Sequence, residues 1–294
     1  MRALALALVA GTVVVTAQAP ISIGLVREDG YLIPIATVTP ALFAPPFPFE
    51  TNANGEPLPP EKREWPFKTL QWRLSSPGKA PVEITTLEPL ILDSHCTEQS
   101  VWRTTLKLFP AQKNVAPVGK IGAAISGGTL EHPEDVSGQP DAASRRVASR
   151  IVQLTHAKEA ERVASEPAQY LPPNHSPAER AKVAVRVAQL RRHSAAGLAT
   201  YYFEATKAWG AALDNGLVTG WIVDTPSGLK DHDVKYKFND DRFKENARAI
   251  VWGIVRSSGR SLWILEWHGY ESESYTLHEW PSGVERVVVD GGAC

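Results

Sequence analysis

The sequence contains little cysteine, no excess charge of either sign and, beyond its first residues, no long apolar run. Lys and Arg together number 31 against 32 Asp and Glu, which gives a formal net charge of −1. A chain so close to neutrality has no general electrostatic attraction to nucleic acid or to an anionic membrane surface. Its later apolar runs are also shorter than the roughly 20 residues of a transmembrane helix. We therefore predict a protein that binds no nucleic acid and does not span a membrane.

Motifs with a well-understood chemistry are also missing. The chain contains no Gly-rich phosphate loop, no Cys-x-x-Cys pair and no His-Glu-x-x-His sequence. These patterns supply the donors or ligands that phosphates and zinc require, so their absence argues against nucleotide-binding and structural zinc proteins. We expect no metal site and no cofactor.

The first residues have the layout of a secretory signal peptide. A basic start at Arg2 precedes the apolar run Ala3–Val15, and small residues follow at Ala17 and Ala19. This run is too short to cross a bilayer of roughly 30 Å. We predict a signal peptide over residues 1–17 and export to the periplasm or the extracellular space. A buried N-terminal strand and an uncleaved anchor are the alternatives.

Only two cysteines are present, Cys96 and the final residue, Cys294. In an exported chain an even pair favours a disulfide, and a bond to the last residue holds down a C-terminus that otherwise frays. Closure of so long a loop contributes about 5 kcal/mol in the chain-entropy description. We predict a Cys96–Cys294 disulfide, with free or intermolecular thiols as the alternative.

The stretch from Ala249 to Val289 has the pattern of a β-meander. Four runs rich in β-branched and aromatic residues alternate with turn sequences such as Pro281-Ser282-Gly283. The predicted strands are Ala249–Arg256, Ser261–His268, Ser274–Trp280 and Val284–Val289. We predict a mainly β (α+β) fold of antiparallel sheets, with this meander in a C-terminal region spanning residues 196–294.

The N-terminal region, residues 18–138, is also rich in strand patterns. Ile21–Arg27 and Tyr31–Val38 flank Asp29-Gly30, a sequence typical of hairpin turns because Gly readily adopts positive φ. Pro34 lies in the second run and cannot donate a ladder hydrogen bond, so we place that strand at a sheet edge. Further strands are predicted at 68–75, 82–92, 101–108 and 118–126.

The segment 40–66 separates these strands and contains eight of the 23 prolines. Proline removes a backbone donor and fixes φ, so regular structure is disfavoured here. Aromatic residues such as Phe47 and Trp65 set the segment apart from a plain linker. We interpret it as a packed irregular loop, with a cover over a sheet or the wall of a ligand-binding groove as alternatives.

Residues 139–195 change to a helical period and predict an inserted helical hairpin. In its first half, from Ala142 to Ala164, apolar residues recur at helical spacing as Val147, Ile151 and Leu154.

The second helix of the hairpin is predicted to begin at Ser176, because Glu179 stands at the spacing of a capping box. We expect its buried stripe to consist of Val183, Val187 and Leu190.

The hairpin and the end of the chain carry opposite charge. The hairpin holds ten Lys or Arg against five acids, whereas residues 261–294 hold six acids against Arg286 alone. We expect the hairpin to lie across the meander, although exposed pairs contribute only ~0–1 kcal/mol each. Two separately solvated faces are the alternative.

The most polar cluster in the sequence is Asp231-His232-Asp233. We predict a loop here, between strands that end near Asp224 and begin near Ala249. Two carboxylates with an imidazole can bind a divalent metal or act as acid and base. Their spacing matches neither the calcium loop nor the zinc-protease motif, so a solvated loop is the alternative.

A second candidate site follows from the period of the meander. If Trp267 pairs opposite Tyr275, then His268 faces Ser274, and Glu266 lies beside them. Glu266, His268 and Ser274 then resemble an orienting acid, a base and a nucleophile. A one-residue change of register abolishes that arrangement. The alternative is that this face of the sheet is simply exposed to water.

Six of the nine tryptophans lie in the final third of the chain. Trp263, Trp267 and Trp280 of the meander are candidates for a binding strip that stacks on a sugar or contacts a partner. Core packing is the alternative, because each indole buries a large apolar area.

These observations favour an exported, non-catalytic binding or envelope-interaction protein, whose partner is a protein or a glycan. The leader, the Trp-rich sheet and the Pro-rich aromatic loop motivate this hypothesis. The alternative is a secreted hydrolase that acts on glycans or peptides through a carboxylate and histidine site.

Overall fold

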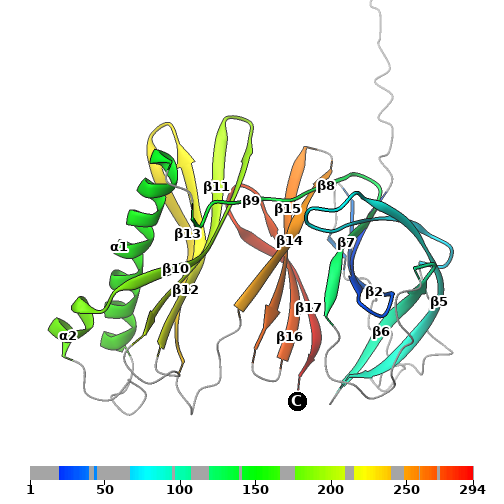
Figure 1. The fold of residues 1–294 in the computed structure, drawn as a ribbon, viewed down its shortest axis with the longest axis horizontal. Coiled ribbons are helices and arrows are strands. Elements are labelled where there is room, and N and C mark those ends of the chain that lie inside the picture. The colour runs from blue at the N-terminus through cyan, green and yellow to red at the C-terminus, as the bar shows by residue number, and fades with distance from the viewer. Residues whose placement is uncertain are drawn as a thin grey trace, which may run out of the picture.

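Within the residues that the structure describes, three antiparallel sheets and one long helix form four successive layers (Figure 1). The computed structural model describes residues 20–39, 43–44, 67–94, 97–106, 119–138, 141–165, 176–208, 215–239, 248–257, 259–269 and 272–293. From one end to the other, the layers are helix α1, an outer sheet, a central sheet and a closed barrel (Figure 1). The predicted mainly β class is confirmed.

The barrel consists of six strands from the N-terminal half of the chain. They follow the order β1-β7-β4-β5-β6-β2, and pairing of β1 with β2 closes the sheet. A short strand, β3 (Phe43–Ala44), pairs antiparallel with the end of β2. The barrel strands are β1 (Ile21–Arg27), β2 (Tyr31–Val38), β4 (Gln71–Ser75), β5 (Val82–Ser94), β6 (Thr97–Thr104) and β7 (Lys120–Ser126). The predicted hairpin at Asp29-Gly30 is confirmed, and Gly30 has φ 84°.

Pro34 does not mark an edge strand, contrary to prediction. On one side of β2, Pro34 lies opposite Gly24 at a shift in the β1–β2 register. On the other side, β2 pairs with β6 through Tyr31 and Leu32 and with β3 through Thr37 and Val38, so Pro34 lies between two short ladders. A bulge and a break between partners therefore accommodate the missing N–H inside a closed sheet.

The barrel has an aromatic interior, and it also packs outward. Inside it, Phe67 contacts Trp72 and Trp102 with ring centroids 5.6 and 6.4 Å apart. On its outside, Ile23 and Leu25 of β1 pack against the central sheet. Strand β1 is consequently buried on both faces, which its nearly unbroken apolar sequence requires.

The central sheet is the predicted meander, joined by one strand from an earlier part of the chain. Its order is β17-β16-β15-β14-β8. Its strands are β8 (Thr129–Glu131), β14 (Arg248–Ser257), β15 (Arg260–His268), β16 (Ser272–Glu279) and β17 (Val284–Ala293). The four meander strands agree closely with the predicted ranges.

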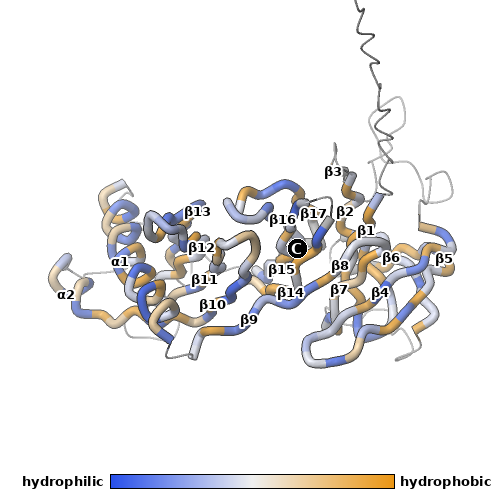
Figure 2. The backbone as a smooth tube through the Cα atoms, turned by 90° about the horizontal axis from the view of Figure 1, so that it is seen from above, coloured by the Kyte–Doolittle hydropathy of each residue, from blue (hydrophilic) through white to orange (hydrophobic). Residues whose placement is uncertain are grey.

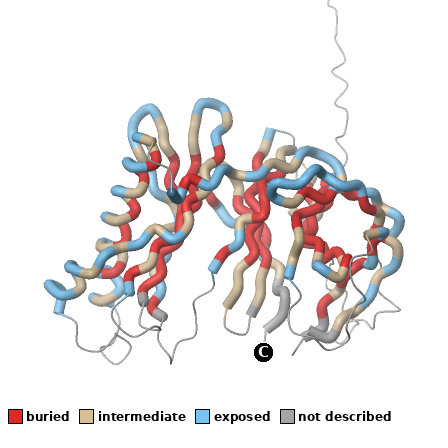
Figure 3. The backbone as a smooth tube through the Cα atoms, viewed as in Figure 1, coloured by how far each residue is buried: buried red, intermediate tan, exposed pale blue. Residues whose placement is uncertain are grey.

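Strand β15 is covered on both faces over residues 261–266, so the alternative of a face exposed to water is wrong for this stretch, although His268 at its end is partly exposed. Leu262 and Ile264 of β15 pack against the barrel. Trp263 and Leu265, on the other face, pack against the outer sheet. All six residues from 261 to 266 are buried, and Figure 3 shows buried residues concentrated in the strands of both sheets. Strand β15 is therefore a core strand, with a layer packed on each of its two faces.

The outer sheet has the order β13-β12-β11-β10-β9. Its strands are β9 (Glu134–Asp135), β10 (Val185–Ala195), β11 (Leu198–Ala208), β12 (Asn215–Thr225) and β13 (Gly228–Asn239). The connection that carries β8 and β9 runs from the barrel past the central sheet to the outer sheet (Figure 1). This segment joins all three sheets.

Helix α1 (Ala142–Ser165) covers the outer sheet and confirms the first half of the predicted hairpin. The expected stripe of Val147, Ile151 and Leu154 is buried in a core with β10, β11 and β12. Figure 2 shows hydrophilic and hydrophobic segments along the helix.

The second half of the hairpin is mostly a strand. Helix α2 (Pro177–Lys182) begins at Ser176 with the predicted capping box to Glu179, but it is only six residues long. Val187 and Leu190 belong to β10, which pairs with β11. Tertiary pairing prevails because Val185 and Val187 also satisfy the two-residue period of a strand.

The charge asymmetry predicts that helix α1 lies across the meander. The helix instead packs on the outer sheet. Its Arg146 pairs with Asp224, and its Arg150 lies 2.6 Å from Asp231. These acids belong to β12 and β13 of the outer sheet. The arginines of α1 therefore pair with acids that are nearer to the helix in the sequence than the C-terminal acids are.

Some predictions concern residues outside the described ranges. These include the signal peptide at 1–17, Cys96, Cys294 and, apart from residues 43–44, the Pro-rich loop at 40–66. The leader and the disulfide therefore stay predictions. Neither helix in the described ranges combines the length and apolar character that a membrane crossing needs.

Candidate functional site at the junction of barrel and central sheet

The register between β15 and β16 differs by one residue from the predicted one. Trp267 lies opposite Ser274, and His268 lies opposite Glu273. Directly opposed residues share a face, so Ser274 is on the tryptophan face, away from His268. The predicted grouping of Glu266, His268 and Ser274 is therefore wrong for its serine. Glu273 takes that place.

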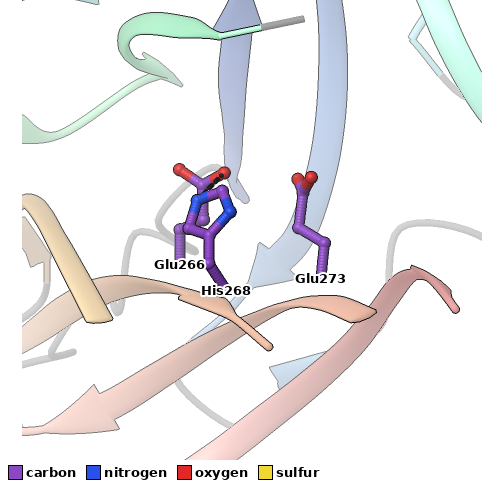
Figure 4. A group of neighbouring side chains, drawn as sticks. All are labelled: Glu266, His268 and Glu273. Atoms are coloured by element: carbon purple, nitrogen blue, oxygen red, sulfur yellow. Dashed lines mark ion pairs between the residues drawn. The ribbon is translucent and has the colours of Figure 1, made fainter. Parts of the chain in front are cut away.

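The shifted register assembles two carboxylates and an imidazole (Figure 4). One ligand atom from each of Glu266, His268 and Glu273 lies within 4.8 Å of the others. The Nε2 of His268 is 2.9 Å from Oε1 of Glu266. The side chain of Glu266 is fully buried, whereas that of His268 is 41% exposed. The cluster thus has a buried end and an end open to solvent.

A lysine from the barrel completes the cluster. Lys120, the first residue of β7, places its Nζ 2.8 Å from Oε1 of Glu266 and also pairs with Glu273. Its side chain is only 4% exposed, and Nζ lies 5.6 Å from the centroid of the Tyr275 ring. Sequence reasoning missed Lys120, because a single lysine at the start of an apolar strand carries no local signal.

Further hydrogen bonds hold the two carboxylates in place. The indole Nε1 of Trp252 donates to Oε2 of Glu266 at 2.6 Å. The hydroxyl of Tyr275 donates to Glu273, and Gln99 Nε2 of β6 donates to that hydroxyl at 3.4 Å. Such contacts fix the orientation of a carboxylate, so Trp252 and Tyr275 hold the two acids in place.

The contacts perturb the titration of all three groups. Burial alone raises the pKa of Glu266, but the contact with His268 and the ammonium of Lys120 outweigh it and lower that pKa to about 2. The contact with Glu266 raises the pKa of His268. Burial raises the pKa of Glu273 despite the nearby lysine. At a pH where His268 is neutral and both carboxylates are ionised, two negative charges face one ammonium, and the cluster then favours a further positive charge.

The donor set fits a divalent cation. Carboxylate oxygen and imidazole nitrogen are ordinary ligands for such ions. Two atoms bound to one ion at about 2.1 Å each are roughly 3–4 Å apart, so small side-chain movements suffice to close this set. The same three groups can also exchange protons with a substrate, because an acid and a base lie in contact.

The other polar candidates do not come together. Asp231, His232 and Asp233 lie on strand β13, not in a loop. Asp231 pairs with Arg150, and Asp233 lies 3.0 Å from Lys235. Asp231 and His232 are successive strand residues opposite Ile222 and Trp221, so their side chains project to opposite faces. A register shift at Asp233, where φ is 45°, separates it further from the other two.

The tryptophan candidates form a seam between the outer and central sheets. Trp263 is fully buried, with its ring centroid 5.1 Å from that of Trp221. Trp267 and Trp280 are half-buried, and they contact Tyr202 and His193 respectively. Core packing therefore describes Trp263, and only the other two retain exposed area.

One pair of residues escaped sequence reasoning altogether. Oγ of Ser75, at the end of β4, lies 2.8 Å from Nε2 of His132, which is exposed just after β8. The two residues are 57 positions apart, so no local sequence motif indicates that they meet.

Comparison with known proteins identifies no relative. Neither a protein-family model, nor a curated protein, nor a solved structure matches this chain.

Proposed function

We propose that this protein is an exported, non-catalytic binding protein that takes a divalent cation at the junction of barrel and central sheet. The observation that carries the proposal is the cluster of Glu266, His268 and Glu273, whose ligand atoms lie within 4.8 Å of one another. The leader-like residues 1–17 support the export part of the proposal. A protein or glycan partner in the envelope is part of the same proposal.

The ligand type narrows the class of ion. Imidazole suits zinc, nickel, copper and iron, whereas carboxylates also suit manganese, magnesium and calcium. A set of one imidazole and two carboxylates therefore favours a first-row transition ion such as Zn²⁺ or Mn²⁺ over Ca²⁺. Three protein ligands leave a further position for water or for a donor from a partner.

Positioning of the ligands supports this use of the site. The two carboxylates belong to neighbouring strands of one sheet, and each accepts a hydrogen bond from an aromatic side chain, Trp252 or Tyr275. In metal sites such outer contacts orient the ligands and are worth about 10–100-fold in affinity. The exposed side of His268 provides an entry path.

Titration calorimetry of the full chain with Zn²⁺ and with Mn²⁺ tests the proposal. We expect one ion per chain, and a loss of binding in Glu266→Gln and in His268→Gln. His232→Gln, on the edge of the outer sheet, is the matched control and should bind as the parent does. Binding that is equal in all four proteins places the ion elsewhere and overturns the proposal, as does no binding by the parent.

A secreted hydrolase is the second candidate, and the contact of Ser75 with His132 favours it. A hydroxyl 2.8 Å from an imidazole nitrogen is at the distance expected of a nucleophile and its base. The test is hydrolysis of ester, peptide and glycoside chromogens by the full chain and by Ser75→Ala. Activity that disappears in a folded Ser75→Ala protein supports a hydrolase, whereas activity that survives in this variant, or is absent from the parent, rejects it.

A further inference from the structure

We propose that Lys120 is a built-in cation that competes with an external ion for the cluster of Glu266, His268 and Glu273. The position of one side chain thereby controls whether the site is open. This inference depends on the proposed cation-binding function and adds its regulation.

Lys120 occupies the place that a bridging ion would take. Its ammonium pairs with both carboxylates, at 2.8 Å from Oε1 of Glu266 and in contact with Oε1 of Glu273. Oε1 of Glu266 is also the atom that lies 2.9 Å from the imidazole of His268. The ammonium and an added ion thus need the same lone pairs, so they cannot both be fully bound.

Charge favours exchange over joint occupancy. With a neutral imidazole, two carboxylates and one ammonium leave a net charge of −1. A divalent ion added beside the ammonium changes this to +1 and places two cations against each other in a buried location. If the ion replaces the ammonium, the cluster becomes neutral. Exchange is therefore the balanced arrangement.

The proposed exchange requires the side chain of Lys120 to move. This side chain consists of a four-carbon stem with three rotatable donors, which allows the head group to move while the strand stays in place. In its paired position the ammonium already lies over the ring of Tyr275, with Nζ 5.6 Å from the centroid, so this cation–π contact is one of those that hold it now. The half-exposed His268 marks the side on which the cluster meets solvent.

Exchange also alters the connection between layers. Lys120 belongs to β7 of the barrel, whereas both of its acidic partners belong to the central sheet. An ion bound by β15 and β16 alone removes this tie, and the apolar contacts of Leu262 and Ile264 with the barrel remain. Ion binding is thereby linked to how firmly the barrel is held.

The test compares Lys120→Met with the parent chain in calorimetric titrations with Zn²⁺ alone and with Mn²⁺ alone. Methionine keeps much of the apolar stem and removes the charge. We expect Lys120→Met to bind roughly tenfold more tightly, or better, as the loss of a charge competitor worth about 1.4 kcal/mol requires. Lys235→Met is the matched control, since Lys235 pairs with Asp233 on the outer sheet, and it should bind as the parent does.

The outcomes separate the two proposals. Equal affinity of Lys120→Met and the parent overturns the competition and leaves the cation site standing. No binding by either protein overturns the cation site itself. If Lys120→Met does not fold, ¹⁵N signals of the lysine ammonium in the parent provide the measurement. Zn²⁺ should then shift the buried Lys120 signal toward that of solvated lysines, and an unchanged signal in the presence of bound ion contradicts the inference.

Discussion

Lys120 of the barrel and Glu266 of the central sheet meet 2.8 Å apart, with side chains that are 4% and 0% exposed. They form a buried ion pair between two layers whose residues are far apart in the sequence. Removal of one member of such a pair leaves the other charged and unpaired, which is more costly than the loss of the attraction alone.

We predict that Lys120→Ala lowers the free energy of unfolding by about 3–5 kcal/mol, the range for breaking a buried pair. The double variant Lys120→Met/Glu266→Gln should lose less, because neither partner is then left charged. Urea unfolding of the parent, Lys120→Met, Glu266→Gln and the double variant, with Lys120→Ala beside them, measures this. A double variant that is as unstable as the sum of the two single changes contradicts the prediction.

Acid should destabilise the protein through His278. This imidazole is 2% exposed, its Nδ1 lies 2.9 Å from the carbonyl of Gly283, and its Nε2 lies 2.9 Å from the hydroxyl of Thr276. Burial lowers its pKa in the folded state below the ordinary 6.5. The unfolded chain therefore binds a proton first, so stability is fully present above pH 6.5 and falls as the pH drops toward the folded value.

The slope for one such group is at most about 1.4 kcal/mol per pH unit. Urea midpoints measured at pH 7.5, 6.5 and 5.5 should fall less steeply in His278→Gln than in the parent. His232→Gln controls for the loss of one histidine. A parallel decline in parent and His278→Gln assigns the acid sensitivity to other groups.

Glu204 should show the opposite dependence on pH. It is buried between the outer and central sheets, where Oε1 accepts hydrogen bonds from Tyr202 at 3.1 Å and from the backbone N–H of Ala249 at 2.7 Å. Burial raises its pKa. Its contribution is therefore fully present below the unfolded value near 4.5 and is lost as the pH rises through the folded value.

At pH 8 we expect Glu204→Gln to be at least as stable as the parent, because the amide oxygen still accepts these bonds without a buried charge. Glu204→Ala should lose about 1–3 kcal/mol, since two buried donors lose their acceptor. Chemical denaturation of both variants checks this order. A Glu204→Gln protein that is less stable than Glu204→Ala refutes it.

Gly283 should be far less replaceable than Gly259. Both adopt positive φ, at 69° and 77°, so alanine is strained at either position. A Cβ at Gly283 meets the ring of Trp221 at 2.3 Å, whereas nothing lies within 4 Å of a Cβ at Gly259. We expect Gly283→Ala to lose about 1–3 kcal/mol more than Gly259→Ala, the usual penalty of overpacking. Thermal unfolding followed by tryptophan fluorescence measures it, and equal losses contradict the predicted clash.

Local patterns were sufficient for much of the fold. The four strands between Ala249 and Val289 and the hairpin at Asp29-Gly30 were found because turn residues separate β-branched runs. The capping box at Ser176 was found because its hydrogen bonds span three residues. Each of these signals depends only on neighbours in the chain.

Patterns that fit two structures were misread. Val187 and Leu190 suit a helical stripe, yet β10 pairs along its length with β11, and that ladder decides the outcome. Pro34 lacks the N–H that a strand residue donates. The sequence does not show that a bulge on one side of β2 and a gap between partner strands on the other leave no hydrogen bond missing there.

From the residues alone one could read the four meander strands with the turns between them, and that Glu266 and His268 share a face. The packing of the layers buries Glu266 and leaves His268 partly exposed, the register places Glu273 rather than Ser274 opposite His268, and the barrel supplies Lys120. The reason is physical. The period of a strand specifies the two sides of a segment, but the register between strands and the layer covering each side are set by contacts between residues far apart in the chain.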